Sequence, residues 1–237
     1  MQEQENTLRH DLIRIIRRAE TVRPRSMQSE IGPSQVGNPC DRSLAFVLAG
    51  GRAMPGQSHD PLPAIVGSAV HAWLEDAAGV DNTIEEATQG AQRWVTERKL
   101  DISHPRFPIS GSCDLFDLHT GTVIDWKVVG GAALRKAEHG GVSDTYRVQA
   151  HLYGLGYSQL GYEVNEVAIC MVPRNGPLGK TLLFSEKWSS ALASAALERA
   201  ADLRGTPWDS HDASPGEDVC RWCPVPYKAC AEGELYR

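Results

Sequence analysis

Two short apolar runs joined by a turn constrain the fold of this chain most strongly. The runs span residues 107–118 and 122–129, and the turn between them is His119-Thr120-Gly121. A short connection that contains glycine, set between two apolar runs, is typical of a β-hairpin. We therefore predict two neighbouring strands here, which bring Asp114 and Asp125 to one end of a sheet.

The remaining elements follow from the spacing of apolar residues. Recurrence at helical spacing predicts helices, and short continuous apolar runs predict strands. Segments rich in Ser, Gly and Pro predict loops, and we expect the glycine-rich segment 130–141 to be mobile. The predicted helices are 8–19, 42–49, 65–78, 84–100, 144–160 and 189–203, the further strands are 164–172 and 180–186, and the loops are 26–39 and 50–63.

These elements predict one integrated α/β domain, for which 237 residues are sufficient. We assign residues 1–63 to an N-terminal helical segment, 64–205 to the core and 206–237 to a cysteine-rich extension. Since no apolar run approaches the ~20 residues that cross a bilayer, we expect no membrane partner. The polar start of the chain does not resemble a secretory signal, so we expect a cytoplasmic protein.

The net charge of −6 counts only weakly against a nucleic-acid partner, because DNA responds to local basic patches and not to the total charge. The N-terminal segment is locally basic, and it is either a solvated helix face or a surface that faces DNA. Its arginines are Arg9, Arg14, Arg17, Arg18, Arg23 and Arg25.

Three cysteines near the C-terminus form a metal-ligand pattern. Cys220 and Cys223 are separated by two residues, and Cys230 follows closely. A tetrahedral thiolate site needs a fourth ligand, and we assign Cys40, which lies in a loop ahead of a helical run. The two other cysteines lie in apolar, strand-like runs, where a small buried side chain explains them. Four thiolates hold either zinc or an iron–sulfur cluster, and spacing alone does not decide between them.

The predicted hairpin also carries a pattern of charged residues at its strand ends. Asp114 and Asp125 offer the oxygen ligands that Mg²⁺ or Mn²⁺ prefers. Such a metal polarises a phosphodiester and lowers the pKa of a bound water. Lys127 shares a strand face with Asp125, since strand side chains repeat every two residues, and its ammonium can orient the water or stabilise phosphate charge.

With these residues in place, the chain resembles the PD-(D/E)XK nuclease superfamily, and within it the RecB-like and Cas4-like iron–sulfur exonucleases. The resemblance spans residues 40 to 230 and five motifs in the expected order. The motifs are Gly67 to Glu75 around His71, Gly111-Ser112-Cys113-Asp114, Val123-Ile124-Asp125-Trp126-Lys127, Gln149 to Tyr153, and the four cysteines Cys40, Cys220, Cys223 and Cys230.

The resemblance implies a role for each matched residue. It makes Lys127 the catalytic lysine, with Gln149 and Tyr153 orienting this lysine and the DNA backbone. It gives Asp114 and Asp125 a catalytic role through the metal. The implied metal ligands are His71, Asp114, Asp125 and the backbone carbonyl of Trp126, with a further contact from Glu75.

The resemblance also implies a restriction-endonuclease-like core, a mixed β-sheet flanked by helices, with a [4Fe–4S] cluster on the four cysteines joining the two ends of the chain. The implied activity is a Mg²⁺- or Mn²⁺-dependent DNA exonuclease, phage-encoded and acting on single strands or duplex ends in recombination or repair. The alternatives are spacer processing of the Cas4 type in CRISPR adaptation and a catalytically silent DNA-binding iron–sulfur module. A helicase or recombination partner would be a separate protein, and oligomeric state is left open.

Overall fold

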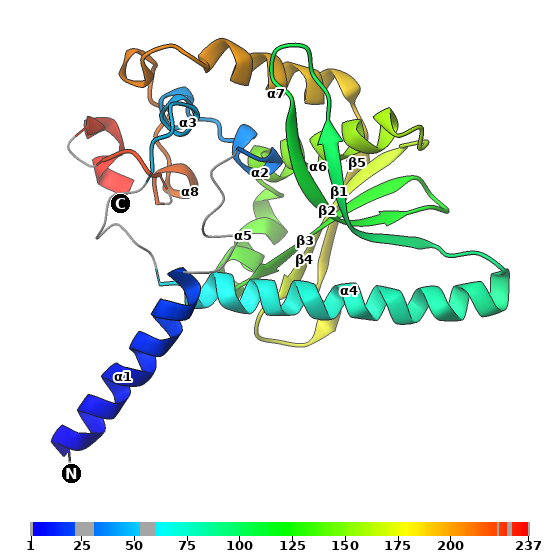
Figure 1. Cartoon of the computed structure of the whole chain (residues 1–237), viewed down its shortest axis with the longest axis horizontal. Coiled ribbons are helices and arrows are strands. Elements are labelled where there is room, and N and C mark those ends of the chain that lie inside the picture. Colours follow the sequence, from blue (N-terminus) through cyan, green and yellow to red (C-terminus); the bar gives the residue numbers. More distant parts are fainter. Residues whose placement is uncertain (1, 22–30, 53–59, 222, 227–228, 237) are drawn as a thin grey trace.

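The computed structural model describes residues 2–21, 31–52, 60–221, 223–226 and 229–236 (Figure 1). It contains a single five-stranded sheet with helices around it, so the predicted mixed α/β class is confirmed. The strands are β1 (Trp94–Ile102), β2 (Ile109–Asp117), β3 (Thr122–Val129), β4 (Glu166–Pro173) and β5 (Leu182–Lys187). Within the described residues, no helix is both long and apolar enough to cross a membrane.

The strands lie side by side in the same order as in the sequence, β1-β2-β3-β4-β5. Strands β1, β2 and β3 form an antiparallel meander, and the predicted hairpin is its β2–β3 half. Strand β4 pairs parallel to β3, and β5 returns antiparallel to β4. A parallel neighbour requires a crossover connection, and here the crossover contains α5 (Gly131–Gly140) and α6 (Asp144–Gln159).

Helix α6 forms the centre of the core. It contacts β1, β3 and β4, and its outer side packs against α2 (Pro33–Val36) and α7 (Ser190–Leu203). Tyr157 of α6 is fully buried and stacks on Phe116 of β2, with ring centroids 4.2 Å apart. Gly156 faces Leu100 and Ile102 so closely that a Cβ would lie 3.0 Å from the Leu100 Cβ, which lets α6 approach β1.

The other helices surround this core. Helix α4 (Leu62–Gln89) contacts β1, β2 and β3 and runs along the lower side of the sheet in Figure 1, while α1 (Gln2–Thr21) extends away from it. Helix α3 (Asp41–Leu48) lies between α7 and the C-terminal segment. That segment contains the short helices α8 (Glu217–Cys220), η3 (Trp208–Ser210) and η5 (Ala231–Tyr236), and η2 (Leu178–Lys180) precedes β5.

The prediction of a helix at 84–100 is wrong. The preceding helix, predicted at 65–78, begins earlier and continues to Gln89, where Gly90 ends it in the left-handed conformation with φ 79°. Residues 94–102 form β1 instead, which pairs with β2 along nearly its whole length. Ladder hydrogen bonds and a buried face at Leu100 and Ile102 outweigh the weak helical spacing of the local sequence.

No regular element was predicted for the glycine-rich segment 130–141, whereas residues 131–140 form α5. The stretch between its terminal glycines consists mainly of strong helix formers, and Leu134 and Ala137 bury one face. Gly141, with φ 73°, ends the helix. Two predicted loops are also partly helical: α2 lies within 26–39 and α4 starts at Leu62, within 50–63. The residues 26–30 and 53–59 of those loops lie outside the described part of the chain.

Candidate active site

The site begins at an interruption in the ladder between β1 and β2. The residues before and after Glu97 pair with the residues after and before Asp114, in one continuous register. Glu97 and Asp114 therefore lie opposite one another, although these two residues are not themselves paired. Glu97 has φ 43°, in the left-handed region that side chains other than glycine seldom occupy. The backbone there is strained, and strain of this kind persists where the surrounding structure holds it in place.

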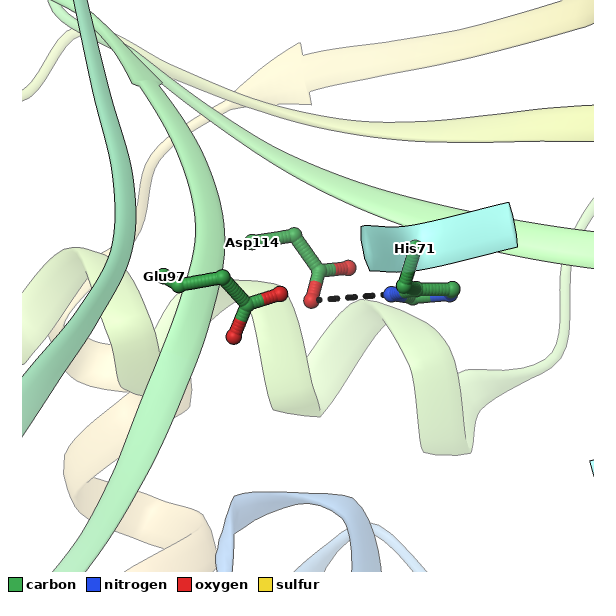
Figure 2. A group of neighbouring side chains, drawn as sticks. All are labelled: His71, Glu97 and Asp114. Atoms are coloured by element: carbon green, nitrogen blue, oxygen red, sulfur yellow. Dashed lines mark ion pairs between the residues drawn. The ribbon is translucent and has the colours of Figure 1, made fainter. Parts of the chain in front are cut away.

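The interruption lets three side chains converge. Figure 2 shows Glu97 of β1, Asp114 of β2 and His71 of α4 pointing toward one another. One ligand atom from each lies within 4.8 Å of those of the other two. His71 Nδ1 lies 3.4 Å from Asp114 Oδ1. All three side chains are half-buried, so the group is open to a ligand from solvent.

Asp114 is fixed on its other side by the next strand. Its Oδ2 accepts a hydrogen bond of 2.7 Å from the backbone N–H of Trp126 in β3. Asp114 lies one residue beyond the last paired residues of β2 and β3, Leu115 and Ile124, and its register partner in that direction is Asp125. Three carboxylates therefore stand on three adjacent strands, at Glu97, Asp114 and Asp125.

Asp125 is the most deeply buried of these acids, with 1% of its surface exposed. Its carboxylate forms an ion pair with Lys127 Nζ, and within the described residues neither oxygen has a hydrogen-bond donor of suitable geometry. Burial raises the pKa of Asp125 to about 6, and the nearby Asp114 charge adds to the rise, while Lys127 and His71 oppose it. This carboxylate thus has too little positive charge around it for its degree of burial.

Lys127 is held by residues of α6 as well as by Asp125. Its Nζ donates a hydrogen bond of 3.1 Å to Gln149 Oε1, and Gln149 Nε2 in turn donates to the Tyr153 hydroxyl at 3.3 Å. The ammonium also lies 4.7 Å from the centroid of the Tyr146 ring, a distance at which a cation–π contact is favourable. Burial raises the pKa of Tyr153 well above its usual range, so its hydroxyl stays protonated.

His71 completes the charge pattern. Its hydrogen bond to Asp114 raises the pKa of the imidazole, and burial opposes this rise only in part. The nearby Asp125 charge favours the protonated ring, whereas Lys127 disfavours it. The protonated imidazolium is therefore favoured at His71 relative to a free histidine side chain.

The structure brings most of the residues predicted for the site into one region. His71 contacts Asp114, and Asp125, Lys127, Gln149 and Tyr153 form one connected chain beside them. Trp126 contributes its N–H to Asp114. Glu75 is exposed and, within the described residues, does not belong to the converging group. Which of these groups ligate a metal stays a prediction.

Glu97 was missed by the sequence analysis. It lies in the segment for which a helix was predicted, and in a helix it would have had no relation to Asp114. The signal that points to it is tertiary, since only the pairing of β1 with β2 sets Glu97 opposite Asp114.

The four cysteines assigned as cluster ligands lie where the N- and C-terminal segments contact one another. Cys40 precedes the first residue of α3, and its Sγ accepts a 3.4 Å hydrogen bond from Ser214 N. Arg42 bonds the His211 carbonyl at 2.9 Å and pairs with Glu232 at 2.9 Å. Each of the other sulfurs also has a polar neighbour: Gly216 N for Cys220, Ser43 Oγ for Cys223 and Arg42 Nη1 for Cys230, at 3.4, 3.4 and 4.0 Å.

No protein-family model matches the chain, and no curated protein matches it. Among solved structures, SSO0001 is 16% identical, with 83% of each chain covered and a TM-score of 0.48. LHK-Exo in complex with dAMP is 15% identical, covering 74% of this chain and 86% of that one, with a TM-score of 0.49. The alkaline exonuclease LHK-Exo from Laribacter hongkongensis, in a second structure, aligns over the same shares at 12% identity and a TM-score of 0.48. Likeness at this level assigns no activity, so the candidate function rests on this chain's own residues.

Proposed function

We propose that this chain is a divalent-metal-dependent nuclease that hydrolyses phosphodiester bonds in DNA. The observation that carries the proposal is the convergence of His71, Glu97 and Asp114 beside the Asp125–Lys127 ion pair. The arrangement combines a group of metal ligands with a positioned lysine, and a bound cation and a lysine can both stabilise the charge that develops on the phosphate during phosphodiester hydrolysis.

The donor set fits a divalent cation. Carboxylate oxygens suit Mg²⁺ and Mn²⁺, and a single imidazole among them is better tolerated by Mn²⁺. The buried Asp125 carboxylate, whose charge Lys127 offsets only in part, also favours a second cation nearby. His71, Glu97, Asp114 and Asp125 would hold the metal, which when bound supplies a Lewis acid for the phosphate and a water of lowered pKa.

The remaining residues position the reacting groups. Lys127 reaches the site from the same strand as Asp125, and its Nζ is held between that carboxylate and Gln149. The ammonium is therefore ready to bind a phosphate oxygen or to orient the attacking water. Gln149 and Tyr153 restrain this lysine through a second hydrogen bond, so it keeps its position before substrate arrives.

We further propose that the substrate is single-stranded DNA or a duplex end, cleaved as an exonuclease would cleave it during recombination or repair. The motif resemblance supports this narrower assignment. It also supports a [4Fe–4S] cluster on Cys40, Cys220, Cys223 and Cys230, and in the structure every one of these sulfurs has a polar neighbour.

The choice of an iron–sulfur cluster over zinc rests on the motif resemblance, because four thiolates can hold either group. Hydrogen bonds to the sulfurs are among the features that tune iron–sulfur clusters.

The nuclease activity is tested with DNA labelled at its 5′ or 3′ end in the presence of Mn²⁺. Lys127→Met and Asp125→Asn should each lower the rate by about 10²-fold or more, because each removes a charge that acts at the phosphate. Lys187→Met, at an exposed position on β5, is the matched control and should retain activity. Wild-type rates in both site variants would refute the proposal, and loss in the control would point to a folding defect instead.

The cluster is tested separately by measuring iron and acid-labile sulfide after purification without oxygen. We expect four irons per chain and a brown protein, with both lost in Cys223→Ser. Cys170→Ser, which removes a buried cysteine of β4 outside the proposed set, should keep the iron. A colourless protein with one zinc per chain would contradict the iron–sulfur assignment while leaving the nuclease proposal intact.

A further inference from the structure

Two helices carry most of the large apolar side chains that the described part of this chain exposes to solvent. Of the twelve such side chains in the described residues, four lie on α1 and four on α4. On α1 they are Leu8, Leu12, Ile15 and Ile16, and on α4 they are Leu62, Trp73, Val80 and Ile84, with exposures between 46% and 64%. Exposed apolar side chains grouped in this way mark an interaction surface.

Helix α4 has two distinct faces. The first contacts β1, β2 and β3 and contributes His71 to the candidate active site. The second is an apolar stripe. With a turn of 100° per residue, its side chains all lie within about 40° of one line drawn along the helix surface. None of the 28 residues of α4 is fully buried, so the fold itself does not cover this stripe. Its members recur every three or four residues: Leu62, Val66, Ala69, Trp73, Ala77, Val80, Ile84 and Ala87.

Helix α1 repeats this pattern over a shorter length. Leu8, Leu12, Ile15 and Ala19 follow one another at spacings of four, three and four residues. Apolar residues at alternating three- and four-residue spacing form the seam of a coiled coil, in which each side chain inserts between those of a facing helix. Both helices therefore have the periodicity needed to pack against another helix.

The charges on the two helices are complementary. Helix α4 contains five acidic residues and neither lysine nor arginine. At 100° per residue, the exposed Asp76 lies about 60° from the centre of its apolar stripe and the half-buried Asp81 about 80° from it on the other side, whereas the three glutamates lie more than about 110° away. Helix α1 contains four arginines and four acids in all, but residues 8–18 hold all four arginines and only one of the acids, and the exposed Arg9 and Arg18 flank the stripe of α1. An apolar stripe with acidic flanks attracts a helix whose apolar seam has basic flanks.

We propose that α1 of one copy packs on the apolar stripe of α4 of a second copy, and that two copies exchange these helices reciprocally. Each chain carries both complementary surfaces. In a pair of copies, α1 of each copy covers the stripe on α4 of the other, which gives a closed dimer with twofold symmetry. At about 1.5 Å per residue, the 20-residue α1 fits within the 28 residues of α4. Because α4 also carries His71, the docked helix lies on the outer side of a helix that contributes to the site.

Sedimentation of the full chain over a range of concentrations tests the dimer. We expect reversible association from 25.9 kDa to twice that mass. Val80→Glu and Ile15→Glu, which place a charge in each stripe, should each abolish association. Leu178→Glu is the matched control, because Leu178 is 74% exposed on η2, outside both helices. Far-UV circular dichroism establishes that each variant is folded.

Charge reversal distinguishes the pairing of α1 with α4 from any other contact. The pair Arg9→Glu and Arg18→Glu should weaken the dimer by about tenfold, and Asp76→Lys should weaken it as well. All three changes in one chain should restore part of the affinity, since the attraction is re-established with reversed sign. A wild-type chain that stays monomeric, including one whose own α1 folds onto its α4, would overturn the proposal. So would association that is insensitive to these changes or that continues beyond a dimer. The nuclease assay is independent of this measurement.

Discussion

The Asp114 carboxylate accepts a 2.7 Å hydrogen bond from the backbone N–H of Trp126, and this bond joins the two central strands of the candidate site. The donor is a backbone group, so the orientation of Asp114 does not depend on the Trp126 side chain. The same carboxylate faces His71 through its other oxygen. Asp114 therefore connects α4, β2 and β3 at one point.

This relationship predicts that Asp114→Asn weakens metal binding while leaving the stability of the fold nearly unchanged. The asparagine carbonyl can still accept the Trp126 N–H, so the melting temperature should change little. The loss of a negative charge should weaken Mn²⁺ binding by more than about tenfold, measured by calorimetry without DNA. Asp202→Asn, in an exposed ion pair with Arg106, serves as the control and should bind Mn²⁺ as wild type does.

The strained backbone at Glu97 gives a prediction that compares two substitutions. Glu97→Gly and Glu97→Ala both remove the carboxylate, so both should weaken Mn²⁺ binding. In an ordinary strand, a protein with glycine is less stable than the same protein with alanine by roughly 0.5–1 kcal/mol. At position 97 the backbone φ is 43°, so the glycine variant should have the larger free energy of unfolding, by about 1 kcal/mol. Urea unfolding of both variants measures this difference, and the usual order, with alanine more stable, would contradict the strain.

The contacts of Lys127 predict a graded series on α6. Gln149→Ala removes the acceptor that holds the Lys127 ammonium. This variant should have a clearly lower kcat and a nearly unchanged KM. Tyr153→Phe leaves Gln149 with one unpaired donor and should have a smaller effect on kcat, with a stability cost of about 1 kcal/mol. Tyr146→Phe keeps the aromatic ring beside Lys127 and should retain near wild-type kcat. Equal losses in all three variants would indicate a general packing defect.

The pH dependence of stability should include a contribution from Asp117. Burial raises the pKa of this carboxyl, but hydrogen bonds from Arg93, His119 N and Thr120 outweigh it and lower the pKa below its usual value. Arg93 holds both carboxylate oxygens, at 3.1 and 2.8 Å. A lowered native pKa stabilises the fold above the unfolded pKa of about 3.9, and this contribution disappears as pH falls through the native value.

Comparison of Asp117→Asn with wild type in urea at several pH values measures this contribution. The variant should be less stable at pH 7, and the difference should shrink as the pH falls below about 4. A difference that stays constant down to pH 2 would exclude the ionised carboxylate as its source. Arg93→Gln should reproduce part of the same pH dependence, because it removes the partner of Asp117.

Local sequence was enough to predict the hairpin, α6, α7 and the last two strands to within a few residues. The apolar spacing of those elements agrees with the face that each buries in the fold, and the glycine turn between β2 and β3 leaves few alternatives. Helix α5 was missed because glycines at both ends of a segment resemble a loop, although the residues between them favour a helix.

The sequence by itself determined the order of the charged residues at the site and placed Asp114, Asp125 and Lys127 on two adjacent strands. Their expected place at strand ends is wrong, because all three lie within β2 and β3. Only the tertiary structure decided that Glu97 joins them. The segment that contains it has a mixed pattern that suits a helix or a strand, and its pairing with β2 settled the matter. Strand pairing depends on residues distant in sequence, so a local pattern does not contain the information that selects it.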